Sequence, residues 1–151
     1  MTERAGRVGI GCDHAAVELK RALMPLIEEL GGSLRDFGTD GPESCDYPDF
    51  AHAVAEAITA GQLDRGVLIC GTGLGMSYAA NRHAGVRAAL CTDGFTARMA
   101  RAHNDANVLC LGARVVGIGV AEDIVRAFFT TDFDGGRHAR RVAKIEPGDK
   151  P

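Results

Sequence analysis

The sequence predicts a three-layer α/β/α sandwich built on a five-stranded parallel sheet. Short apolar runs alternate with longer segments whose apolar residues recur at helical spacing. Several of the short runs are apolar on consecutive residues, which is typical of strands covered on both faces. The chain has 151 residues, 46% hydrophobic and 25% charged, which is the size and composition of a single globular domain spanning residues 1–151.

Each element can be placed from its pattern of apolar residues. The expected strands are residues 8–12, 33–37, 67–70, 88–91 and 108–111. The expected helices are residues 17–30, which Gly31 and Gly32 should end, and residues 50–60, 76–82, 95–104, 120–129 and 137–145. Because strand and helix alternate along the chain, the sheet should be parallel and Rossmann-like, with helices on both faces.

The composition excludes several classes of protein. No stretch reaches the roughly 18 consecutive apolar residues of a membrane span, and the N-terminus lacks the pattern of a secretory signal. We therefore expect a cytoplasmic protein with no membrane partner. The net charge of −3 argues against a nucleic-acid partner. The five cysteines lack C-x-x-C spacing, so we expect neither a disulfide framework nor a metal site.

A glycine-rich turn is the strongest local signal for a ligand site. In open parallel sheets, ligands bind beyond the carboxyl ends of the strands. The segment Cys70-Gly71-Thr72-Gly73-Leu74-Gly75 follows one such strand and opens a helix. Its backbone N–H groups could hold a phosphate or an enediolate oxygen, although a tight turn without a ligand has the same spacing. A nucleotide site is disfavoured because the spacing is not G-x-G-x-x-G.

Polar side chains accompany this turn. Cys70 ends its strand directly before the turn, whose N–H groups would stabilise a thiolate able to act as base or nucleophile. A buried, inert cysteine is the alternative. Asp13-His14 follows the first strand, and His103-Asn104 ends a helix. The alternative is a structural role, with Asp13 as a helix N-cap and His103 as a favourable residue at a helix C-terminus. We expect these groups to converge with the turn in one cleft of the chain.

Arginines supply a second candidate anion site. Fourteen of the 17 basic residues are arginines, a bias that favours bidentate recognition of oxyanions. In a helix, Arg137 and Arg141 would share one face and could grip one phosphate, although a solvated basic face is the alternative. The acidic segment 38–49 has no basic neighbours in sequence and is expected to be a solvated loop.

Seven ordered motifs resemble one known family. They are Gly11-Cys12-Asp13-His14-Ala15, Asp46-Tyr47-Pro48, the Cys70 to Gly75 turn, Ala79-Ala80-Asn81, Arg101-Ala102-His103-Asn104-Asp105, Gly112-Ala113-Arg114-Val115-Val116 and Gly136-Arg137-His138 to Arg141. Together they resemble the ribose-5-phosphate isomerase B family, which also includes galactose-6-phosphate and allose-6-phosphate isomerases. The resemblance covers residues 8–145, which is nearly the whole chain.

The resemblance implies an aldose–ketose isomerase without cofactor or metal, acting on D-ribose 5-phosphate and D-ribulose 5-phosphate. Cys70 would move a proton between C1 and C2 through a cis-enediolate, with Thr72 assisting at the oxygens. Family members without this cysteine carry a glutamate where this chain has Met76, which favours Cys70 as the base. Another phosphorylated sugar, such as allose 6-phosphate, galactose 6-phosphate or a tetrose phosphate, is the alternative substrate, and a nucleotide-binding module without catalysis is a remote one.

The other matched residues imply how the sugar phosphate is held. His103 would open the furanose ring, and the family is at least dimeric, so we expect a homodimer or a tetramer in which Arg137 and Arg141 serve the neighbouring subunit's site. The expected substrate-binding residues are Asp13, His14, Tyr47, Gly71, Gly73, Leu74, Gly75, Asn104, Arg114, Arg137 and Arg141.

Overall fold

A computed structural model describes residues 5–148, and its five strands form one parallel sheet. The order across the sheet is β2-β1-β3-β5-β4. The strands are β1 (Gly6–Cys12), β2 (Gly32–Asp36), β3 (Arg65–Cys70), β4 (Ala88–Leu90) and β5 (Val108–Gly112). Every strand bound lies within two residues of its predicted position, because each strand coincides with a run of apolar residues between turn-forming residues.

Six helices occupy the six predicted segments. They are α1 (Val17–Glu29), α2 (Tyr47–Thr59), α3 (Leu74–Ala80), α4 (Gly94–Asn104), α5 (Ile118–Thr130) and α6 (Arg137–Val142). Four of them, α2, α3, α4 and α5, begin one to three residues earlier than predicted. In α2, Pro48 fits the first turn of a helix, where its missing N–H has no acceptor to lose. In α3, Gly73 in the left-handed region turns the chain directly into the helix.

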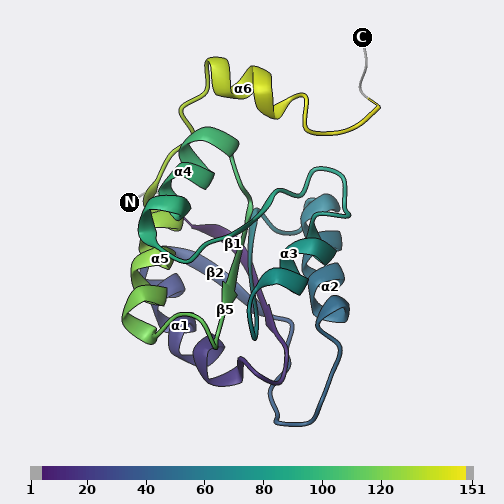
Figure 1. Cartoon of the computed structure of the whole chain (residues 1–151), viewed down its shortest axis with the longest axis vertical. Coiled ribbons are helices and arrows are strands. Elements are labelled where there is room, and N and C mark those ends of the chain that lie inside the picture. The colour runs from purple at the N-terminus through teal and green to yellow at the C-terminus, as the bar shows by residue number, and fades with distance from the viewer. Residues whose placement is uncertain (1–4, 149–151) are drawn as a thin grey trace.

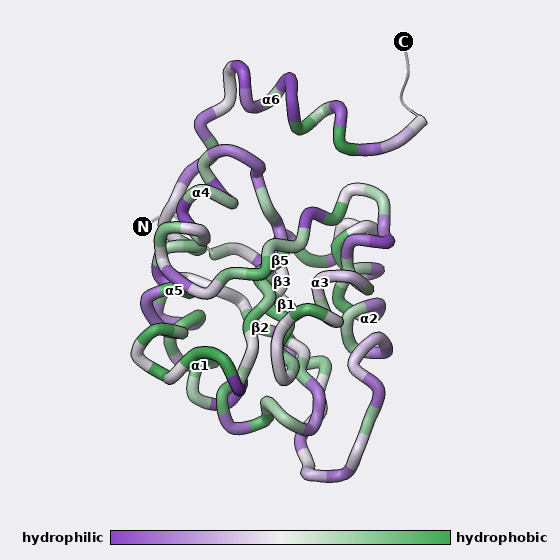
Figure 2. The backbone as a smooth tube through the Cα atoms, viewed as in Figure 1, coloured by the Kyte–Doolittle hydropathy of each residue, from purple (hydrophilic) through white to green (hydrophobic). Residues whose placement is uncertain are grey.

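The helices cover both faces of the sheet, which confirms the three-layer sandwich (Figure 1). Side chains alternate along β3: Val67 and Ile69 belong to the apolar core formed with α1, α4 and α5, whereas Leu68 and Cys70 belong to the core formed with α2 and α3. Figure 2 shows the hydrophobic strands enclosed between these layers. None of the helices within residues 5–148 is long and apolar enough to cross a membrane.

The sheet topology places a switch point between β1 and β3. The chain leaves β1 to form β2 on one side and then crosses to form β3 on the other side. Their carboxyl ends are joined by a hydrogen bond of 3.1 Å from the Asp13 N–H to the Ile69 carbonyl. Ligands of open parallel sheets bind at such a point, so the residues after β1 and β3 are the first place to look for a site.

Candidate active site

The turn after β3 is tightly built around Cys70. The Cys70 side chain is buried, and its sulfur accepts a hydrogen bond of 3.1 Å from the Gly73 N–H. Gly73 has a φ of +81°, and a Cβ there would lie 2.5 Å from Leu90 Cδ1 and 2.9 Å from the Leu111 carbonyl carbon. Only glycine meets both conditions, so the sequence at this position fixes the shape of the turn around the sulfur.

The turn also offers hydrogen-bond donors. Thr72 Oγ1 accepts a 3.2 Å hydrogen bond from the Leu74 N–H, which leaves the hydroxyl proton of Thr72 free to point at another oxygen. Gly75 and Met76 lie in the first turn of α3, where backbone N–H groups have no acceptor within the helix. An oxyanion site requires such preorganised backbone and hydroxyl donors, and here they lie beside a buried thiol.

Asp13 and His14 stand beside this turn, at the end of β1. Asp13 is buried, and its Oδ1 accepts a 3.0 Å hydrogen bond from the Ala15 N–H. Nδ1 of His14 accepts a 3.2 Å hydrogen bond from the Cys45 N–H. A ring nitrogen can accept only when it is unprotonated, so the neutral His14 ring carries its proton on Nε2 and presents an N–H donor there.

Tyr47 and Arg114 border the turn on two further sides. The Tyr47 ring packs on Gly75 so closely that a Cβ at Gly75 would lie 2.5 Å from two ring atoms. Arg114 follows β5; its backbone N–H donates to the Gly71 carbonyl at 3.0 Å, and its guanidinium would lie 3.4 Å from a Cβ at Gly71. One chain therefore brings together ten of the predicted positions: Asp13, His14, Tyr47, Cys70, Gly71, Thr72, Gly73, Leu74, Gly75 and Arg114.

His103 and Asn104 lie at the amino ends of the strands, which we call the amino edge of the sheet, whereas the Cys70 turn lies at the carboxyl edge. The expectation that they share one cleft with Cys70 in the same chain is therefore wrong. They end α4, and a helix that follows a parallel strand runs back toward the amino ends of the strands. The Asn104 carbonyl accepts a 3.1 Å hydrogen bond from Nε of Arg87, the residue before β4. In this fold the C-terminal end of a helix lies beside the amino ends of the strands, whereas the Cys70 turn lies at their carboxyl ends. The prediction overlooked this difference.

Arg137 and Arg141 also lie away from Cys70. They are on α6, which is helical as predicted and stands away from the body of the molecule over the end of α4 (Figure 1). The contact between these helices is a stack of the His103 and His138 rings, with centroids 4.2 Å apart and planes 6° from parallel. Both arginines are exposed, whereas His138 is buried.

His138 and Asp134 are neighbours of His103 that the sequence did not reveal as such. Burial, followed by the nearby His103 ring and the charges of Arg137 and Arg141, lowers the pKa of His138. Asp134 Oδ2 lies 4.0 Å from His103 Nε2. Potential ligand atoms of the three residues lie within 4.8 Å of one another. The parallel rings direct their nitrogen lone pairs side by side rather than at one point, so this arrangement fits stacked imidazoles better than a metal chelate.

The acidic loop after β2 is not simply solvated, contrary to expectation. Asp40 forms a 2.9 Å ion pair with Lys20, and Arg21 donates to the Asp40 carbonyl at 2.8 Å. The hydrogen bond from Lys20 and its charge hold the pKa of Asp40 below its usual value. The basic partners come from α1, about twenty residues earlier in the chain, so the local composition of the loop gave no sign of them.

Comparison with known proteins identifies the family. Residues 8–145 match the family model described as Ribose/Galactose Isomerase. Ribose-5-phosphate isomerase B of Escherichia coli (strain K12) is 45% identical over 139 residues, covering 92% of this chain and 93% of the relative. D-erythrulose-4-phosphate isomerase of Pectobacterium atrosepticum is 42% identical over 139 residues, covering 91% of each.

Solved structures agree with this result. Ribose-5-phosphate isomerase B of Clostridium thermocellum superposes with a TM-score of 0.89 at 55% identity, covering 92% of this chain and 94% of that one. The type B ribose 5-phosphate isomerase of Trypanosoma brucei gives a TM-score of 0.90 at 44% identity, covering 92% and 95%. The chain therefore belongs to the ribose/galactose isomerase family and is an aldose–ketose isomerase.

Proposed function

We propose that this protein interconverts D-ribose 5-phosphate and D-ribulose 5-phosphate, with Cys70 as general base and without metal or organic cofactor. The observation that carries the proposal is the 3.1 Å hydrogen bond from the Gly73 N–H to the buried Cys70 sulfur. This bond fixes the sulfur at the start of the turn, and a cysteine sulfur takes up a proton as the thiolate. The same turn supplies donors for an oxyanion.

The chemistry needs only these groups. The Cys70 thiolate removes the proton from C2 of the open-chain aldose, and the electron pair of that C–H bond forms the C1–C2 double bond while O1 becomes an oxyanion. Backbone donors in such a hole contribute about 3 kcal/mol each to stabilising the developing charge. The Thr72 hydroxyl assists as the O2 proton moves to O1. The Cys70 thiol then returns its proton to C1, which leaves the carbonyl at C2.

The remaining groups of the chain position the sugar. His14 presents its Nε2–H and Asp13 its carboxylate at the end of β1, and Tyr47 closes the side formed by α2. Arg114 brings a guanidinium to the turn, where it can bind the phosphate. Holding the phosphate fixes C1 and C2 relative to Cys70, which lowers the entropy cost of the proton transfer.

A second copy of the chain completes the site in this proposal. His103 to open the ring, Asn104 to contact the sugar, and Arg137 and Arg141 to bind the phosphate would come from the partner of a homodimer, since one chain holds them at the far edge. Large apolar side chains exposed near the turn support a covered surface there: Leu74, Tyr78 and Phe95 are 43%, 60% and 62% exposed. Two such dimers could form a tetramer.

The cysteines support a reducing compartment. All five are free thiols, and four of them are buried among apolar residues. Proteins of oxidising compartments commonly use cysteines in disulfides, whereas cytosolic proteins keep them reduced. We therefore infer that the protein works in the cytoplasm.

A tetrose phosphate is the second candidate substrate. The relative named D-erythrulose-4-phosphate isomerase matches almost the whole chain at 42% identity, nearly as high as the ribose-5-phosphate isomerase B of Escherichia coli. The same proton transfer serves either sugar, because the reacting atoms are the two carbons at the carbonyl end. Allose 6-phosphate and galactose 6-phosphate are longer substrates of the same chemistry.

Deuterium exchange tests both the reaction and its base. Phosphorylated aldoses and ketoses of four to six carbons are incubated with the protein in D₂O and followed by NMR. We expect isomerisation and deuterium incorporation fastest with ribose 5-phosphate, and loss of both in Cys70→Ala. Cys91→Ala is the matched control, because Cys91 is a buried cysteine in the core on the other face of the sheet. A fully active Cys70→Ala variant would exclude Cys70 as the base, and faster turnover of a tetrose phosphate would establish the second candidate.

A further inference from the structure

We propose that Lys20 is a positioning residue for His14: its buried ammonium holds the loop formed by residues 37–45, so that the Cys45 N–H fixes the tautomer of the His14 ring. The proposal rests on the proposed function only in treating His14 as a contact of the sugar. Lys20 lies on α1, outside every motif that carries the family resemblance.

Lys20 is a fully buried cation with all of its donors in use. Its side chain has 0% exposed surface. Nζ lies 2.8 and 2.9 Å from the two oxygens of Asp36, 2.8 Å from the Thr39 carbonyl and 2.9 Å from Asp40 Oδ1. A buried ammonium without such partners would be strongly destabilising. The cation therefore ties α1 to the end of β2 and to the start of the loop.

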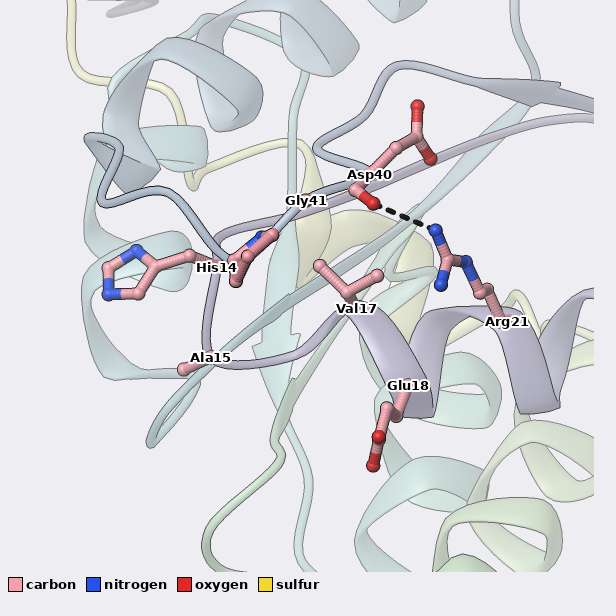
Figure 3. Close-up of a pocket in the computed structure, with 8 residues that line it drawn as sticks. His14, Ala15, Val17, Glu18, Arg21, Asp40 and Gly41 are labelled. Atoms are coloured by element: carbon pink, nitrogen blue, oxygen red, sulfur yellow. Dashed lines mark hydrogen bonds between the residues drawn. The ribbon is translucent and has the colours of Figure 1, made fainter.

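The loop is also fastened to the end of β1, directly before Asp13 and His14. The Cys12 N–H donates to the Gly38 carbonyl at 2.7 Å, and the Thr39 N–H donates to the Cys12 carbonyl at 2.8 Å. Arg21 adds a bond to the Asp40 carbonyl, drawn in Figure 3. The carbonyl of Thr39 is bound by Lys20 while its N–H is bound by β1, so this one residue is gripped from two elements.

The far end of the loop reaches His14 through the Cys45 N–H, 3.2 Å from Nδ1. This bond requires an unprotonated Nδ1 and so selects the ring with its proton on Nε2. Between Lys20 and His14, Gly41 and Pro42 of the loop line a cavity of about 310 Å³. His14 lines the same cavity (Figure 3). Releasing Thr39 and Asp40 from Lys20 would move this side of the cavity and free the Cys45 N–H, and His14 would then exchange between tautomers.

The test replaces the cation by a neutral side chain of similar length, Lys20→Met. The ¹⁵N NMR shifts of the His14 ring, assigned by comparison with His14→Asn, report the tautomer in the free protein. We expect one tautomer in the parent chain and a mixture in Lys20→Met. We also expect KM for ribose 5-phosphate to rise about tenfold, the effect of one lost hydrogen bond, with kcat changed less than about threefold because the Cys70 turn is untouched.

Two further variants keep the outcome decisive. Arg7→Met removes the exposed ion pair of Arg7 with Asp64 and should leave both the tautomer and KM unchanged. If Lys20→Met does not fold, Asp40→Ala removes one partner of Lys20 at a largely exposed side chain, and we expect a partial tautomer mixture with KM raised about twofold to threefold.

A folded Lys20→Met, or failing it Asp40→Ala, that keeps a single His14 tautomer and the parental KM would overturn the proposal, even if its stability is lower. If the parent chain turns over no sugar phosphate, the proposed function fails, while the NMR measurement still decides the role of Lys20.

Discussion

The two edges of the sheet carry the predicted site residues in different ways. At the carboxyl edge, Cys70 is buried, Gly73 and Gly75 are packed against neighbouring side chains, and backbone hydrogen bonds link the loops after β1, β3 and β5. At the amino ends of the strands, Asn104 is exposed at the end of α4, and Arg137 and Arg141 are exposed on the short helix α6, which projects from the molecule.

This difference separates two tasks. Proton transfer at carbon depends on groups held to within a fraction of an ångström, which a close-packed turn provides. Recognition of a charged phosphate tolerates a longer reach, which exposed arginines on a projecting helix can supply. Under the proposed function, each chain would build the proton-transferring half of one site and contribute the phosphate-binding half of its partner's site.

Mixing two inactive variants tests whether Cys70 and His103 of different subunits form one site. Of the predictions made here, it has the largest expected effect. Alone, Cys70→Ala should lose about 10³-fold in kcat as a lost general base, and His103→Asn about 10²-fold as a lost ring-opening group. After joint unfolding and refolding, random dimers should recover about a quarter of the parental activity, because half of the dimers hold one site with both residues intact.

The control is to mix each variant with itself under the same refolding protocol, which should recover nothing. If the mixed sample is as inactive as its parents, the two residues do not meet across chains, and the division between the edges is wrong.

Substituting two glycines separately tests whether the turn at the carboxyl edge is rigidly packed. Gly73→Ala meets both a left-handed φ of +81° and side-chain and backbone atoms within 3 Å, so we expect a loss of about 2–4 kcal/mol in the free energy of unfolding. Gly61→Ala is the matched control: its φ is +74° but nothing lies within 4 Å, and only the conformational part, about 1–2 kcal/mol, should be lost. Urea denaturation measures both, and equal losses would mean that the turn yields without strain.

Local patterns explain which features could be read from the sequence. The strands were found because each is a run of buried apolar residues, and the turn was found because Cys70 to Gly75 are consecutive. The pairing of Lys20 with Asp36 and Asp40 was missed, since it joins residues 16 and 20 positions apart that only the packing of α1 on β2 brings together.

The edge on which His103 lies was missed for a different reason. Its residue type and its neighbour Asn104 suggested a site, but the direction of α4 relative to the strands decides where the pair is displayed. That direction follows from the parallel sheet, so the correct edge was in principle deducible from the predicted fold.

Arginine variants test the amino edge with a moderate effect. Arg141→Ala should raise KM for ribose 5-phosphate about tenfold while changing kcat less, since a phosphate contact stabilises ground state and transition state alike. Arg140→Ala is the control, because Arg140 is also exposed but lies on another face of α6. Steady-state kinetics on both variants decides the matter: an Arg141→Ala variant with parental KM would remove that arginine from the phosphate site.

The stacked histidines predict the smallest effect, on the pH dependence of stability. The pKa of His138 is lowered in the folded chain, chiefly by burial and then by His103, so the folded protein binds fewer protons there than the unfolded one. The stability that depends on a neutral His138 is complete above the unfolded pKa of about 6.5 and decreases as the pH falls below it toward the folded pKa. We expect urea unfolding midpoints to decline between pH 7.5 and 5.5, and the decline to be shallower in His138→Phe, which keeps a ring over His103 without a titratable group. An equal decline in both proteins would assign the pH dependence to other groups and leave the contact of α6 with α4 insensitive to protonation.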